Sequence, residues 1–151
     1  LTFFIWKFIY LEVILLKKEV NNMLIDQIKL FNVLQDDLEK QKDCVKNNKL
    51  FELDCIGIKI NSVCKNIAEI EIKLRNLLGK QTIKEFVMEN KDDEELYGSY
   101  IFLVSQVERL SLIKNDNQFL IKKSLTFINK LLSSINNNTN QCNVYTRKMS
   151  Y

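Results

Sequence analysis

The sequence predicts an all-α fold: a long antiparallel helical hairpin or bundle with coiled-coil character and a disordered polar tail at its C-terminus. Two observations support this prediction. The chain of 151 residues contains no proline and only three glycines, so it lacks the turn residues that short strands and tight loops need. Its apolar residues recur at three- and four-residue steps along most of its length, which is the spacing of one helical face.

The composition also argues against several classes of function. Because the sequence has no histidine, the commonest general base and the commonest nitrogen ligand for metals are missing. We therefore expect no enzyme activity, no cofactor and no metal site. The 22 basic and 19 acidic residues give a net charge of +3 and are mixed along the chain, whereas a nucleic-acid site needs a basic cluster.

The four cysteines are not arranged as a metal or redox motif. None of them has C-x-x-C spacing, and we interpret them as reduced, half-buried structural thiols in a reducing compartment. They are Cys44, Cys55, Cys64 and Cys142.

The first residues form a separate apolar segment. Residues 1–16 are rich in large apolar side chains, but Lys7 and Glu12 interrupt them, and the run is shorter than the roughly 20 residues of a membrane span. We expect residues 1–10 to be a packed or poorly ordered extension of a cytoplasmic protein, with the first helix beginning near Tyr10. A membrane-tethered helical protein is the alternative that this segment leaves open.

Residues 11–136 read as one helical domain. A first amphipathic helix should end at Asn47-Asn48, since asparagine tolerates the left-handed conformation that ends a helix. A second helix should run from about Leu50 to Gly79, a favourable residue just past a helix end.

A short helix and a long one should follow. Thr82 and Glu85 have the spacing of a capping box and predict a helix through about Met88. The acidic run 92–95 then suits the positive end of a helix dipole, and we favour a helix start there over acid–base or metal chemistry.

The last helix has coiled-coil spacing. Steps of 3.5 residues predict a seam that Lys114 and Asn117 interrupt; a buried polar residue there would fix the register, and an exposed one would leave the seam open. The apolar positions of this seam are Tyr100, Leu103/Val104, Val107, Leu110, Ile121, Leu125, Ile128, Leu131/Leu132 and Ile135.

The final turns of this helix carry an apolar arc of roughly 160°. This width suits contact with two helices, which are either two neighbours in the same chain or one neighbour and a partner's helix. We predict the arc as the binding surface, and an internal bundle core is the alternative. The arc consists of Leu120, Ile121, Leu125, Phe127, Ile128, Leu131, Leu132 and Ile135.

Residues 137–151 are rich in asparagine and poor in large apolar groups, and a segment of this kind buries too little surface to order itself. We predict a flexible polar tail. Tyr145 stands out in it as an aromatic residue.

The sequence resembles the FlgN family of flagellar export chaperones. The closest similarity is the run 115–128 (NDNQFLIKKSLTFI), followed by Asn143-Val144-Tyr145, with further likeness at 77–83 and around Glu39 and Lys40. The resemblance covers about residues 11–147. Two features depart from the family pattern: Asn47-Asn48 replaces a Gly-Asp-like break, and a Thr-Arg-Lys sequence follows Tyr145.

The resemblance implies a cytoplasmic chaperone for the hook-associated proteins at the hook–filament junction. Such a chaperone holds their terminal amphipathic region until the flagellar type III export gate takes it, and it meets the membrane only through the export apparatus. By the same resemblance, Tyr145 would dock on the export gate. A homodimer, or a structural coiled-coil or adaptor protein that self-associates, remains as an alternative.

Overall fold

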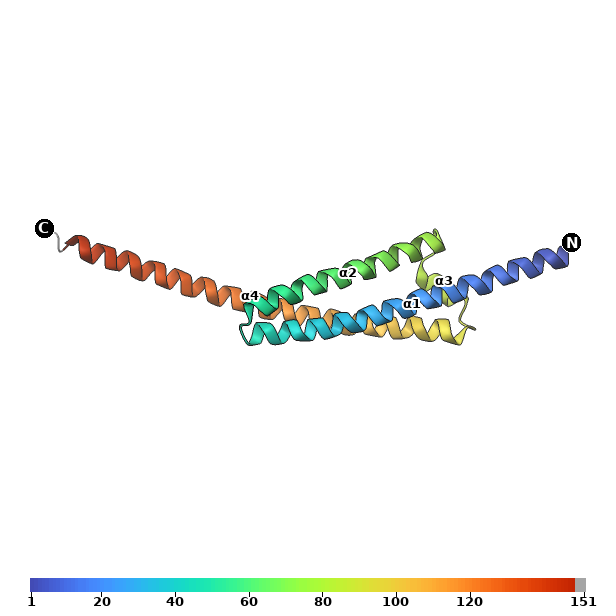
Figure 1. Cartoon of the computed structure of the whole chain (residues 1–151), viewed down its shortest axis with the longest axis horizontal. Coiled ribbons are helices and arrows are strands. Elements are labelled where there is room, and N and C mark those ends of the chain that lie inside the picture. The colour runs from blue at the N-terminus through green and yellow to red at the C-terminus, as the bar shows by residue number, and fades with distance from the viewer. Residues whose placement is uncertain (149–151) are drawn as a thin grey trace.

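The computed structural model (Figure 1) describes the backbone of residues 1–148 and the side chains of residues 1–137. This part of the chain is built from helices alone, which confirms the all-α prediction. The helices are α1 (Thr2–Lys46), α2 (Leu50–Leu78), α3 (Ile83–Glu89) and α4 (Glu94–Lys148).

The predicted break between the first two helices is a full turn. The side-chain amide of Asn47 donates a hydrogen bond to the Asp43 carbonyl oxygen over 2.9 Å. Asn48 has a φ of 53°, in the left-handed region that asparagine enters more readily than most residues. The chain therefore reverses direction here, and α1 and α2 form the predicted antiparallel hairpin (Figure 1).

The second connection follows the sequence signals closely. Gly79 ends α2 with a φ of 65°, which costs glycine no steric penalty. The Glu85 amide donates to Thr82 Oγ1 over 3.2 Å, and the Thr82 amide donates to Glu85 Oε2 over 3.1 Å. The predicted capping box of α3 is confirmed.

The acidic run opens α4 as predicted. The amide of Leu96 donates to Asp93 Oδ1 over 3.1 Å, so this carboxylate caps the first turn of the helix. From there α4 runs back alongside α1 in the same direction (Figure 1). The parallel direction follows because α2 has already carried the chain back along the bundle.

The core lies where α3 closes one end of the bundle. Phe86 and Val87 of α3 are buried against residues of all three long helices. This first cluster is completed by Val20, Leu24, Leu74, Leu96 and Leu103, and a second, smaller cluster around Leu34, Leu38 and Leu110 continues the packing along α1 and α4.

The beginning of α1 differs from the expectation. The helix begins at Thr2 and not near Tyr10. Every residue from 1 to 10 is exposed, so the prediction that this segment packs against the rest of the protein was wrong. No proline or glycine stands in this segment to interrupt the helix. It lacks packing because α4 begins only at Glu94, and Leu96 already lies in the cluster that contains Val20.

The opposite end of the chain bears on the predicted tail. The backbone of α4 is helical as far as Lys148, while the side chains from 138 onwards and the whole of residues 149–151 lie outside the described part. The flexible tail over 137–151 and the domain boundaries stay predictions.

Candidate functional site

Helix α4 is much longer than the bundle that it packs against. α1 ends at Lys46 and α2 begins at Leu50, so neither helix extends beyond the turn that joins them at this end of the bundle. α4 continues past that end as a single projecting helix (Figure 1). We call residues 122–137, the projecting part whose side chains are described, the α4 arm.

The predicted arc lies mainly on this arm. Leu120 and Ile121 are half-buried at the edge of the bundle, and the other six arc residues are exposed. Their exposed fractions range from 43% for Ile128 to 62% for Phe127; the remaining four are Leu125, Leu131, Leu132 and Ile135. These six positions therefore do not belong to an internal bundle core, which was the alternative for the arc.

The arc continues the face of α4 that packs on α1. From Leu103 to Ser124, buried and half-buried residues of α4 recur at alternating steps of three and four, as in a coiled coil. They are Leu103, Gln106, Leu110, Ile113, Asn117, Leu120 and Ser124, and Ile121 is half-buried beside them. At 100° per residue, Ile128, Leu131 and Ile135 lie within the arc of the helix that these seven seam residues span. The arm thus presents the same face after its partner helix has ended.

The register of this seam corrects the predicted one. Gln106 and Ile113 occupy the seam, whereas Val107 is 44% exposed and Lys114 faces solvent. Gln106 can be buried because its amide nitrogen donates to the Ile28 carbonyl oxygen over 3.2 Å and to Asn32 Oδ1 over 2.6 Å. The sequence prediction missed Gln106 because its steps of 3.5 residues passed from Leu103/Val104 to Val107.

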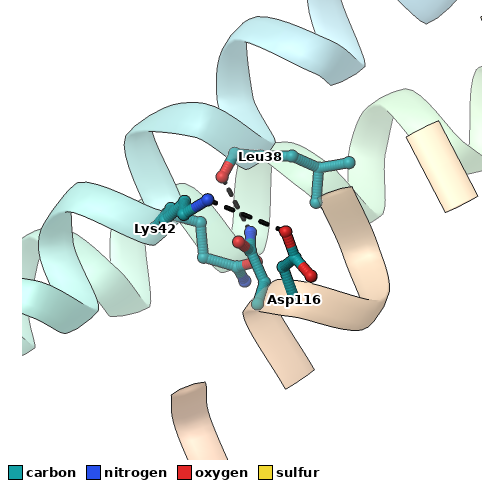
Figure 2. A network of polar contacts seen from close by, with 5 residues as sticks. Leu38, Lys42 and Asp116 are labelled. Carbon is teal, nitrogen blue, oxygen red and sulfur yellow. Dashed lines mark hydrogen bonds and ion pairs between the residues drawn. The ribbon is translucent and has the colours of Figure 1, made fainter. Parts of the chain in front are cut away.

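A polar network marks the last part of the seam (Figure 2). Asn117 is 1% exposed, and its amide nitrogen donates to the Leu38 carbonyl oxygen over 2.7 Å and to Gln41 Oε1 over 2.9 Å. Beside it, Lys42 of α1 pairs with Asp116 of α4 over 3.8 Å. Of the two residues that interrupt the predicted seam, Asn117 is the buried one, and it ties α4 to α1.

The first turns of α1 form a second exposed apolar segment, at the other end of the molecule (Figure 1). Phe3, Phe4 and Trp6 are each more than three-quarters exposed. Polar residues do not gather on one side of residues 1–15, because Thr2, Lys7 and Glu12 lie on different faces. None of the helices in the described part of the chain contains an apolar stretch of the length that a membrane span requires.

Other candidate groups take structural positions. Cys44 is buried, while Cys55 and Cys64 are exposed and not half-buried as expected; Cys142 lies outside the described side chains. In the described part, histidine, cysteine, aspartate and glutamate side chains do not gather into a group of three or more able to hold a metal ion. Tyr145, the predicted docking residue, also lies outside the described side chains.

The sequence profile described as FlgN protein matches residues 16–151. The chain belongs to the FlgN family. Members of this family are flagellar export chaperones that bind flagellar proteins, so this FlgN-family protein is a flagellar export chaperone. The match includes the whole α4 arm and leaves out residues 1–15. Neither the curated proteins nor the solved structures contain a match to the chain.

The Asn117 network gives a prediction about stability. Replacing Asn117 with alanine should lower the free energy of unfolding by about 1–3 kcal/mol, because one buried and one partly buried hydrogen bond are lost. Asp116→Ala is the matched control; it removes a carboxylate that is 67% exposed, and it should cost less than about 1 kcal/mol. Urea denaturation followed by circular dichroism measures both. Equal stability of the two variants would contradict the role of Asn117.

Proposed function

We propose that this FlgN-family protein acts in the cytoplasm and binds the terminal amphipathic region of hook-associated flagellar proteins on the α4 arm. Binding would keep that region from assembling before export, and the loaded complex would then be delivered to the flagellar export gate. The observation that carries the proposal is the exposed apolar arc, which continues the α1–α4 seam beyond the end of α1.

An amphipathic client fits this surface for a physical reason. A helix that carries an apolar stripe can be bound by laying the stripe along a complementary apolar face. The arm offers such a face over about 20 Å of helix, at 1.5 Å per residue. Contiguous apolar surface of this kind is uncommon on monomeric proteins and usually marks an interaction site.

The α4 arm is a better candidate than the start of α1. The family match begins at residue 16, so residues 1–15 lie outside the part of the chain that family membership describes. The arm lies inside it. The arm also has one apolar face and one polar face, whereas residues 1–15 have no polar side that would orient a partner helix.

Export also requires that the client be released. A client segment that folds only on binding loses conformational entropy in doing so, and this lowers its affinity for a given contact area. A single exposed helix face of limited length is consistent with such reversible binding. Neither catalysis nor a cofactor is needed for this cycle.

The first test places a charge on the arc. Ile128→Asp or Leu132→Asp should weaken binding to carboxy-terminal fragments of hook-associated proteins by at least about a hundredfold, because an unpaired charge in an apolar contact costs several kcal/mol. Co-purification followed by isothermal titration calorimetry measures this loss. Both side chains are exposed, so the variants should keep the wild-type melting temperature.

Ser133→Asp is the matched control, because Ser133 is exposed on the polar side of the same arm. It adds the same charge and should leave client binding unchanged. A folded Leu132→Asp protein that still binds its client at wild-type strength would eliminate the arc as the site. If the arc served self-association, light scattering would instead show a dimer of the wild type that Ile128→Asp dissociates.

The second test concerns delivery. Tyr145→Ala should leave helix content and client binding unchanged, weaken association with the soluble domain of the export gate, and reduce motility. The reason is that tyrosine offers a large contact area with few rotatable bonds to fix. Deletion of residues 140–151 should have the same effect. Equal gate binding by the full-length and truncated client complexes would refute a docking role for the tail.

A further inference from the structure

All charged residues of the α4 arm are basic. Asp116 is the last acidic residue of the sequence, so everything that follows it is neutral or basic. The arm carries three exposed lysines, Lys122, Lys123 and Lys130. Within the described part of the chain, no carboxylate forms an ion pair with any of them.

These lysines lie along both borders of the apolar arc. At 100° per residue, Lys122 falls roughly 60° beyond Leu125 at one edge of the arc. Lys123 and Lys130 fall roughly 40–60° beyond Phe127 at the other edge. Since a lysine side chain is long and flexible, each ammonium group can reach a partner that lies on the arc.

An ion pair in the bundle shows how charged residues at the edge of the seam can pair across two helices. Where α1 covers α4, Lys42 of the covering helix pairs with Asp116 at the edge of the seam over 3.8 Å (Figure 2). There the acid is on α4 and the base is on the helix that covers it. On the arm, the residues that border the arc on α4 are lysines. A covering helix of complementary charge would therefore carry aspartate or glutamate at the facing positions.

From this reversal we infer that the client segment is an amphipathic helix whose apolar stripe is bordered by glutamate or aspartate, and that it occupies the position on α4 that α1 leaves empty. The inference rests on the proposed function and specifies the chemistry of the client. Two features support it together: the arc continues the established α1–α4 interface, and its borders carry unpaired positive charge.

The same charges disfavour a second copy as the occupant. Two arms packed on each other would place lysines opposite lysines, and like charges across a helix interface are destabilising. The start of α1 in another copy offers one acidic residue, Glu12, and one basic residue, Lys7, within residues 1–15. It lacks the acidic borders that the arm calls for.

The experiment compares two synthetic peptides of about three heptads each. They share one apolar stripe, and one has glutamate and the other lysine at the bordering positions. The full-length protein should bind the glutamate peptide at least about tenfold more tightly at low salt, by fluorescence anisotropy, and the difference should shrink at high ionic strength because salt screens exposed charges.

Charge reversal in the protein sharpens the comparison. The triple variant Lys122→Glu, Lys123→Glu, Lys130→Glu should prefer the lysine peptide. The matched control reverses three exposed lysines away from the arm, Lys65→Glu, Lys73→Glu and Lys84→Glu, which changes the net charge equally. It should keep the wild-type preference, because the effect depends on the borders of the arc and not on total charge.

Four outcomes would overturn the inference. The first is equal binding of the two peptides, the second is preference for the lysine peptide, and the third is a dimer by light scattering that Ile128→Asp dissociates. Failure of both peptides to bind a protein that still binds hook-associated fragments would also overturn it, since the stated chemistry would then not suffice. Loss of fragment binding in Ile128→Asp would show that the proposed function survives even if the charge inference fails.

Discussion

The pairing of α1 with α4 determines which surface of this protein is left uncovered. The two helices run in the same direction, and Asn117 of α4 is held opposite Leu38 and Gln41 of α1 by two hydrogen bonds. Because α1 ends at Lys46, this register decides where α4 loses its neighbour. A shift of one heptad along the seam would cover or uncover two further positions of the apolar arc.

Asn117 illustrates how a polar group can specify an interface at a cost. Its Oδ1 atom is buried without a hydrogen-bond partner, and a buried acceptor that lacks a partner costs free energy. A buried asparagine in a helical seam restricts the register, since another alignment would leave its amide entirely unpaired. Gln106 acts similarly nearer the start of α4, where its amide nitrogen donates to the Ile28 carbonyl oxygen and to Asn32 Oδ1.

Local signals in the sequence were enough to predict most of the fold. The capping box at Thr82, the glycine after α2 and the acidic start of α4 each depend on a few neighbouring residues, and the structure confirms them. The seam positions depend on packing between distant segments, so Gln106 was missed and Lys114 was wrongly included. Exposure of the arc also could not be deduced, because it depends on where α1 ends relative to α4.

Hydrogen–deuterium exchange of the full-length protein, with and without a bound hook-associated fragment, tests the central claim most directly. Backbone amides in residues 122–137 should exchange rapidly in the free protein, as expected for a projecting helix without tertiary contacts. They should become strongly protected in the complex, while the amides of α2 and of residues 1–15 should change little. Protection confined to α2 or to residues 1–15, with the arm unchanged, would contradict the account.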